Sequence, residues 1–152
     1  VGAYGGRRDI MQTVAPLGPM YQAGTLSGNP LAVQAGIAAL NTLRQPGTYE
    51  ALERLAARLE KGMRDAAKKT ERSVTVNRVG SMLTGFFNPG PVATVAQVES
   101  SDSKAYAAYF HKLLARGVYF APSQYEAAFV SLAHTEADID KTVAAVREAL
   151  AS

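Results

Sequence analysis

Apolar residues in the middle of the chain follow a helical period. They recur at intervals of three and four on one face of the segment that begins at Thr48, at Leu52, Leu55, Ala56, Leu59 and Met63. Glu and Arg occupy the other face, so this spacing predicts an amphipathic helix that packs on one side. From Ser73 the period changes to two in SVTVNRVG, and SMLTGFF follows before NPGP. We expect two strands there, or one strand interrupted by Gly80.

Two further helices are predicted nearer the C-terminus. SDSKAYAAYFHKLLARGV has an Asp or Ser cap, and its apolar face consists of Tyr106, Tyr109, Phe110, Leu113 and Leu114. HTEADIDKTVAAVREAL has Thr135 and Asp138 in a capping-box-like spacing, and we expect it to bury Ile139, Val143, Val146 and Leu150. Between these helices, VYFAP and AAFVSLA predict two short strands.

The first part of the chain is rich in glycine. VGAYGG followed by RRDIMQTVAP predicts a strand end, a glycine turn and a short helix that stops near Pro16. Further along, Asn29 can cap a helix that has Pro30 at its first position and runs toward Leu43. There is no initiator Met, and Val1 opens within an apolar pattern. We therefore expect the chain to be a fragment whose first element needs partners outside it.

The order of these elements indicates the fold class and the domains. Strands separated by helices predict an α/β fold. The RQPG segment at residues 44–47 is a credible hinge between a glycine-rich part and a compact part. We therefore expect two domains, residues 1–45 and residues 46–152, and we expect the second to be a small α/β domain with helices packed on one face of a short sheet.

Composition narrows the class of protein. The 152 residues are 47% hydrophobic and 19% charged, a balance typical of a soluble globular domain. The net charge is only +3, and basic residues alternate with acids on helical faces, so nucleic-acid binding is not favoured. The absence of cysteine excludes disulfides, a thiolate nucleophile and cysteine-ligated metal sites. No apolar run approaches the roughly 20 residues that span a bilayer, and we expect a cytoplasmic protein without a membrane partner.

Small residues and hydroxyls crowd together just before the second predicted helix. Within seven positions the chain has Gly24, Thr25, Ser27, Gly28, Asn29 and Pro30. Thr25 can donate a hydrogen bond to a phosphate oxygen, and glycine at position 24 lets the backbone come close to it. The alternative is that the stretch only caps the helix that follows. The residues by themselves favour neither interpretation.

Other candidate chemistry is weaker. Glu126 lies among Tyr125, alanines and Phe129, where desolvation would raise the pKa of its carboxyl group. The favoured alternative is a loop acid in water. His111 falls within a helix and His134 precedes a predicted cap, and neither belongs to a visible catalytic set. No metal-ligand spacing and no nucleophile-elbow motif are present.

The two candidate segments carry a resemblance to a known family. VGAYGGRRDIMQTVAPLGPMYQAGTLSGNPLA together with APSQYEAAFVSLAHTEADID resembles the glutamate-1-semialdehyde 2,1-aminomutases, pyridoxal-phosphate enzymes of tetrapyrrole biosynthesis related to the class III aminotransferases. The resemblance runs from Val1 to the C-terminus. GNPL by itself would indicate only the wider aminotransferase class, whereas PSQYEAAFVSLAHT narrows the choice to the aminomutases.

The resemblance implies a homodimer of fold type I, in which residues 1–45 are the tail of a large cofactor-binding domain and the remainder is the small C-terminal domain. It implies that Gly24 and Thr25 contact the phosphate of pyridoxal 5'-phosphate in the neighbouring subunit. Tyr21 would then face the active-site cleft, and Glu126 would lie on the substrate side. The implied reaction converts (S)-glutamate-1-semialdehyde to 5-aminolevulinate.

In this family the Schiff-base lysine lies upstream of the segment that matches Val1. None of the lysines present matches it: Lys61, Lys68, Lys69, Lys104, Lys112 and Lys141. We therefore expect no catalytic residue of that kind in this chain, no activity of the chain alone and no retention of the cofactor by it. The alternatives are another class III aminotransferase and, from a different class, a non-catalytic binding or assembly module. Nucleic-acid binding ranks third.

Overall fold

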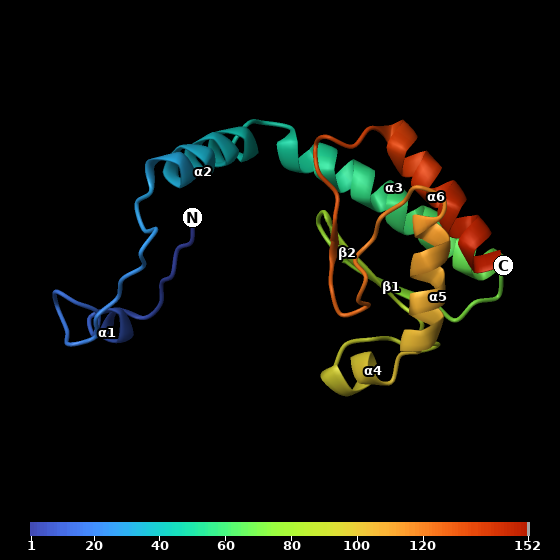
Figure 1. The fold of residues 1–152 in the computed structure, drawn as a ribbon, viewed down its shortest axis with the longest axis horizontal. Helices are drawn as coiled ribbons and strands as arrows, with labels where there is room; N and C mark the ends of the chain where they lie inside the picture. Colours follow the sequence, from blue (N-terminus) through green and yellow to red (C-terminus); the bar gives the residue numbers. More distant parts are fainter. Residues whose placement is uncertain (152) are drawn as a thin grey trace. The chain divides into compact units, whose positions relative to one another are not determined.

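Two compact units divide the chain. The computed structural model describes residues 1–151, and the chain separates into Val1–Gln45 and Pro46–Ser152. The division falls inside the RQPG segment. Figure 1 shows the first unit in blue to cyan and the second from green to red.

The first unit contains two helices, α1 (Arg8–Met11) and α2 (Pro30–Leu43). The predicted start of α2 is confirmed, since the side chain of Asn29 accepts a hydrogen bond from the N–H of Ala32 over 3.1 Å. The strand predicted in VGAYGG is wrong. Residues 1–7 have no regular structure, because no other segment of the described chain pairs with their backbone.

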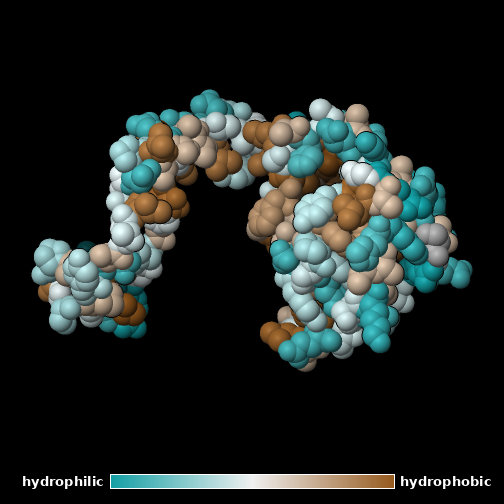
Figure 2. Space-filling view, viewed as in Figure 1, coloured by the Kyte–Doolittle hydropathy of each residue, from teal (hydrophilic) through white to brown (hydrophobic). Residues whose placement is uncertain are grey.

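The first unit has no hydrophobic core of its own. No residue between positions 1 and 45 is buried. Apolar side chains lie at the surface along α2, where Leu31 is 83% exposed and Leu40 59% exposed (Figure 2). Because a helix in a globular protein is stabilised mainly by burying an apolar face, little tertiary packing stabilises this unit.

The second unit is a mixed α/β domain with a small sheet. Its elements are α3 (Thr48–Lys69), β1 (Thr75–Val79), β2 (Met82–Phe86), α4 (Val95–Glu99), α5 (Ser103–Leu114), β3 (Ala128–Phe129) and α6 (Glu136–Ala151). The strands pair antiparallel in the order β1-β2-β3, with Val79 opposite Met82 and Met82 opposite Phe129. The α/β class is thus confirmed, and the period-two segment forms two strands and not one.

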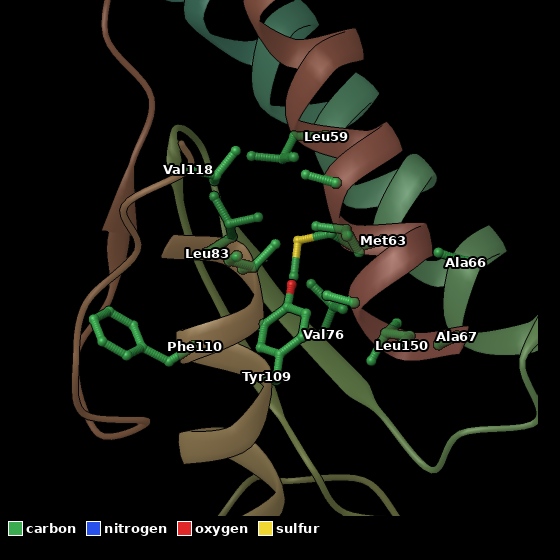
Figure 3. Close-up of a cluster of buried hydrophobic side chains, with 14 of the residues drawn as sticks. Leu59, Met63, Ala66, Ala67, Val76, Leu83, Tyr109, Phe110, Val118 and Leu150 are labelled. Atoms are coloured by element: carbon green, nitrogen blue, oxygen red, sulfur yellow. The ribbon is translucent and has the colours of Figure 1, made fainter. Parts of the chain in front are cut away.

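The core lies between the sheet and the helices (Figure 3). Helix α3 contacts both β1 and β2, α6 runs along α3, and α5 packs against α6. Most positions of the predicted apolar faces are buried, including Ala56, Leu59 and Met63 on α3. Leu114 is an exception: it is 46% exposed, whereas Leu113 is fully buried. Adjacent helical residues are 100° apart, and here the step from Leu113 to Leu114 leads from the buried face of α5 to its exposed side.

The strand predicted in VYFAP is also wrong. Residues 118–122 form a loop, because their backbone groups bond elsewhere. The N–H of Val118 donates back to the carbonyl of Leu113 over 3.0 Å, and the carbonyl of Ala121 accepts from the hydroxyl of Tyr106. In AAFVSLA only Ala128–Phe129 pairs as a strand.

Helix α4 was not predicted from the sequence. Its first turn is closed by a capping box, in which the N–H of Gln97 donates to the Thr94 hydroxyl and the Gln97 side chain accepts from the N–H of Thr94 over 3.0 Å. Thr-x-x-Gln is the signal that would have found it. At α6 the analogous prediction is confirmed: the N–H of Thr135 donates to Asp138 Oδ2 over 2.8 Å.

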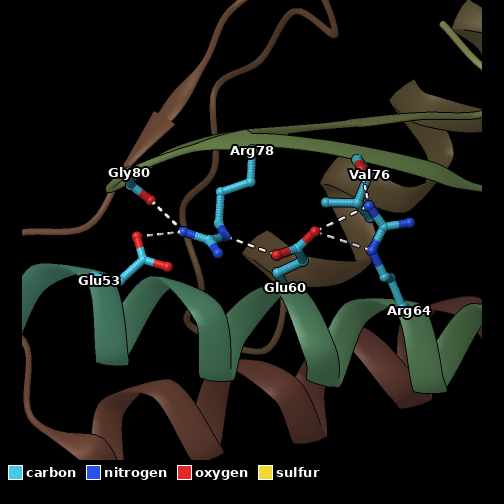
Figure 4. A network of polar contacts seen from close by, with 6 residues as sticks. All are labelled: Glu53, Glu60, Arg64, Val76, Arg78 and Gly80. Carbon is cyan, nitrogen blue, oxygen red and sulfur yellow. Dashed lines mark hydrogen bonds and ion pairs between the residues drawn. The ribbon is translucent and has the colours of Figure 1, made fainter.

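A chain of ion pairs joins α3 to the sheet (Figure 4). Arg78 on β1 donates to Glu60 over 2.7 Å and to Glu53 over 2.8 Å, and Glu60 also accepts from Arg64 over 2.9 Å. Arg64 in turn bonds the carbonyl of Val76. The network therefore fixes the side of α3 that faces β1.

Candidate functional site

The first candidate site is the segment of residues 21–29, named here the Thr25 loop. It consists of two overlapping turns: the N–H of Ser27 donates to the carbonyl of Gly24 over 2.9 Å, and the N–H of Asn29 donates to the carbonyl of Leu26 over 3.1 Å. Asn29 then caps α2. The sequence alternative of a helix cap therefore describes the end of this loop and leaves residues 21–26 unexplained.

Glycine at position 24 lies close to the side chain of Ser27. A Cβ atom built there would lie 2.7 Å from the hydroxyl oxygen of Ser27. The turn thus folds tightly enough that only glycine fits without displacing that side chain.

The Thr25 loop presents hydrogen-bond donors to its surroundings. Among residues 1–151, no acceptor faces the N–H groups of Gly24, Thr25 or Leu26, and the Thr25 hydroxyl has no partner. All three residues are exposed. A set made of backbone N–H groups and one hydroxyl suits an anion such as a phosphate. The donor set therefore fits the phosphate group that the resemblance implies.

Tyr21 opens the same loop. Its side chain is 82% exposed, so its ring is available to contact something outside the first unit. Tyr21, Gly24 and Thr25 thus lie within five positions on one loop. Glu126 belongs to the second unit.

Glu126 lies in the segment of residues 121–127 between α5 and β3, named here the Glu126 loop. Its side chain is exposed, which agrees with the alternative of a loop acid in water and not with a desolvated carboxylate. The backbone is held on both sides: the N–H of Glu126 donates to the carbonyl of Ser123 over 3.2 Å, and its carbonyl lies 3.4 Å from the hydroxyl of Thr84.

A small cavity of about 30 Å³ lies next to this loop. Its lining is mainly apolar and extends from Met63 and Leu83 in the core to Ala121 and Glu126. Space of this size admits one or two water molecules and no cofactor. The cavity therefore joins the Glu126 loop to the core of the second unit without being a ligand pocket.

Two buried tyrosines line this cavity and were read in the sequence only as apolar. Tyr106 is 7% exposed and donates its hydroxyl to the carbonyl of Ala121 over 2.6 Å. Tyr109 is 6% exposed, and its hydroxyl has no partner among the described residues (Figure 3). Burial raises the pKa of both phenols, and the charge of Glu126 adds to the rise at Tyr106. Both hydroxyls therefore keep their protons at neutral pH.

Gln124 is a second buried polar group that the sequence did not reveal. It is 2% exposed, and neither its amide nitrogen nor its amide oxygen has a partner within residues 1–151. The side chain is thus packed among its neighbours without a hydrogen bond to the described residues. No sequence signal distinguishes it from an ordinary loop glutamine.

The contacts of the two histidines are structural ones. His134 accepts a hydrogen bond at Nδ1 from the N–H of Ser131 over 3.0 Å, which closes the turn before α6. His111 is exposed on α5 beside Phe110. Across the described residues, no three His, Asp or Glu side chains converge as metal ligands. Likewise, no helix between positions 1 and 151 has the length and apolarity to cross a membrane.

Comparison with known sequences agrees with the resemblance found in the sequence motifs. The family model for aminotransferase class III matches residues 1–150. The chain is 57% identical over 152 residues to glutamate-1-semialdehyde 2,1-aminomutase of Sorangium cellulosum, covering 100% of this chain and 35% of that protein. It is 58% identical over 149 residues to the aminomutase of Pelotomaculum thermopropionicum, covering 98% and 34%. The chain therefore spans about a third of the length of the curated relatives that it matches.

Solved structures resemble the fold. A transaminase with PLP bound superimposes with a TM-score of 0.78 and 26% identity, over 95% of this chain and 33% of that one. A glutamate-1-semialdehyde aminomutase from Pseudomonas aeruginosa PAO1, solved in complex with PMP, gives a TM-score of 0.75 and 25% identity over 84% and 28%. With the family model matching almost every residue, the chain belongs to the class III aminotransferase family.

Proposed function

We propose that this chain works as part of a longer pyridoxal-phosphate enzyme that converts (S)-glutamate-1-semialdehyde to 5-aminolevulinate. The observation that carries the proposal is the identity of 57% to a glutamate-1-semialdehyde 2,1-aminomutase over all 152 residues. The Thr25 loop supports it independently, because its exposed donors suit a phosphate. The enzyme is proposed to be a cytoplasmic homodimer.

In this proposal the Thr25 loop binds the cofactor phosphate. The Thr25 hydroxyl and the N–H groups of residues 24–26 donate to its oxygens, and Gly24 lets the backbone approach closely. When bound, pyridoxal 5'-phosphate supplies the electron sink that amino-group exchange needs. The lysine that holds it covalently is proposed to lie outside these residues, so the chain alone would be inactive.

Tyr21 and Glu126 are proposed to face the substrate. The exposed ring of Tyr21 forms part of the wall of the cleft and excludes water from one side of it. The exposed carboxylate of Glu126 is free to hold or move a proton at the amino groups of the substrate.

The reaction class can be tested by its need for a second substrate. The proposed substrate and product are isomers, so the complete protein with cofactor should form 5-aminolevulinate without any added amino donor or acceptor. Turnover that depends on an added keto acid would contradict the aminomutase proposal. Borohydride reduction, followed by peptide mapping, would then locate the lysine that holds the cofactor.

A second candidate is another aminotransferase of the same family. A β-phenylalanine aminotransferase from Variovorax paradoxus resembles the chain with a TM-score of 0.76 and 30% identity, over 95% of this chain and 33% of that one. Production of an amino acid from an added keto acid, in step with loss of an amine donor, would favour this candidate. A third possibility, a binding module, predicts no cofactor adduct at all.

A further inference from the structure

The Glu126 loop is tied to the rest of its unit at few points. Inside the loop, the N–H of Tyr125 donates to the Ser123 hydroxyl over 3.2 Å and the N–H of Glu126 donates to the Ser123 carbonyl. Toward the sheet, the contact with the Thr84 hydroxyl is long at 3.4 Å. The short hydrogen bond is the one from Tyr106 to Ala121, at 2.6 Å. By hydrogen bonding the beginning of the loop is therefore its firmly attached end, and the buried side chain of Gln124 adds packing.

Tyr106 is itself held rigidly. It belongs to α5 and is 7% exposed. Its ring packs edge-on to Phe87 with the ring centres 6.3 Å apart, and 6.2 Å from the ring of Tyr109. A side chain with two torsion angles that is packed on two sides has little freedom, so its hydroxyl has a fixed position. The carbonyl of Ala121 is thereby attached to the core.

Tyr106 and Glu126 lie on the same small cavity and interact electrostatically. The phenol keeps its proton at neutral pH, since the ordinary pKa of tyrosine is already 10.0, and burial and the negative charge of Glu126 raise the pKa of Tyr106 further. It remains a hydrogen-bond donor in the conditions under which the enzyme would work. Titration of the phenol therefore does not remove the hydrogen bond to Ala121.

We propose that Tyr106 is a positioning residue, whose hydroxyl holds Ala121 and so sets where the carboxylate of Glu126 stands relative to the substrate. The role that this inference gives to Glu126 rests on the proposed function. The hydrogen bond that attaches the loop to Tyr106 does not depend on the proposed function.

The matched control is one helical turn away. Tyr109 is the same residue type on the same helix with nearly equal burial, and its ring packs on Phe87 with the centres 5.4 Å apart. Its hydroxyl has no partner in the described part of the chain. Tyr106→Phe and Tyr109→Phe remove the same atom from the same layer, and only the first removes a hydrogen bond.

The first measurement is amide hydrogen exchange, followed by mass spectrometry, on the complete protein. Tyr106→Phe should accelerate exchange in peptides covering residues 121–127 by roughly 2- to 10-fold, the range expected for loss of one neutral hydrogen bond. Exchange in β1 and β2 should stay unchanged. Tyr109→Phe should leave the Glu126 loop as in the parent protein. Equal exchange of the loop in the parent and Tyr106→Phe would overturn the proposal.

The second measurement separates positioning from a structural role. With the cofactor bound, Tyr106→Phe should lower kcat roughly 10-fold and leave KM within about 2-fold, because a displaced Glu126 impairs the chemical step more than binding. Tyr109→Phe should leave both constants unchanged. Faster loop exchange with an unchanged kcat would overturn the positioning role.

The two proposals fail in different ways. If the parent protein does not form 5-aminolevulinate, the proposed function fails, and the exchange experiment still decides whether Tyr106 holds the loop. If Glu126→Gln lowers kcat and Tyr106→Phe changes neither loop exchange nor kcat, the proposed function stands and the positioning role is overturned.

Discussion

Arg78 on β1 donates through Nε to Glu60 on α3 over 2.7 Å, and both side chains are shielded from water, at 16% and 21% exposed. Eighteen positions separate the two residues in the chain. Glu53 accepts from the same guanidinium but is 51% exposed. The Arg78–Glu60 pair is thus the inner part of the network that joins α3 to the sheet. Its loss should lower the stability of the second unit more than loss of the outer Arg78–Glu53 pair.

Glu60→Gln should destabilise the second unit by roughly 1.5 to 3 kcal/mol, the usual range for a hydrogen bond to a charged group. The reason is that Arg78 keeps its charge in a shielded position and loses its inner partner. Urea unfolding followed by circular dichroism measures the change. Glu53→Gln is the control and should cost clearly less; equal losses would contradict the inner and outer distinction.

The same pair predicts a pH dependence. Hydrogen bonding to Arg78 lowers the pKa of Glu60 from 4.5. Between the folded and the ordinary pKa, the unfolded chain binds more protons at this site, so stability rises with pH there. The contribution is complete above about pH 4.5 and is lost as the pH falls through the folded pKa. Urea midpoints from pH 7 to pH 3 should fall less steeply in Glu60→Gln than in the parent chain.

Leu113 and Leu114 should differ sharply on truncation. Leu113 is fully buried, so Leu113→Ala should cost roughly 2 to 5 kcal/mol through lost burial and the cavity left behind. Leu114 is 46% exposed, and Leu114→Ala should cost less than about 1 kcal/mol. Thermal or urea unfolding of the two variants measures these losses of stability. Similar losses at both positions would mean that α5 presents a different face to the core.

Gly62 on α3 lies in tight contact with Val143 on α6. A Cβ at this position would lie 2.3 Å from a methyl group of Val143. Gly62→Ala would favour the helix by about 0.5 to 1 kcal/mol, but the overpacking should cost roughly 1 to 3 kcal/mol, so net destabilisation is expected. Adding Val143→Ala should recover part of the loss. A double-mutant cycle that shows simple additivity would argue against this contact.

Thr25→Ala should weaken retention of pyridoxal 5'-phosphate by the complete protein by about 10-fold or more, because one hydrogen bond to a charged oxygen is lost. Equilibrium dialysis of the cofactor measures this. Thr13→Ala is the control, since the Thr13 hydroxyl already donates to the carbonyl of Ile10 over 2.7 Å. Unchanged retention in Thr25→Ala would remove the phosphate-binding role from this loop.

Local signals found most of the helices. Asn29 caps α2, Asp102 caps α5 by accepting from the N–H of Ala105 over 2.9 Å, and Thr135 closes the first turn of α6. Each of these bonds joins residues three positions apart, so the sequence window that encodes it is short. The periodicity of α3 was equally readable, because one face of a long helix must be apolar to pack.

The candidate site was found by a different route. The small residues around Thr25 indicated anion binding or a helix cap without deciding between them, and the roles of Tyr21 and Glu126 came from resemblance to a family. Neither Tyr106 nor Gln124 could have been selected, because a buried tyrosine and a loop glutamine carry no pattern of their own. What distinguishes them is their burial and their partners, and these arise only on folding.

By itself, the sequence determined the family through its motifs. It also determined the α/β class, the starts of most helices and most of their buried faces, since these depend on side-chain periodicity and on bonds within a single turn. Tertiary structure alone decided that residues 118–122 form a loop, that Leu113 and not Leu114 enters the core, and that Tyr106 bonds Ala121 fifteen positions away. Such pairings depend on how the helices pack on the sheet, and no local pattern of residues encodes that packing.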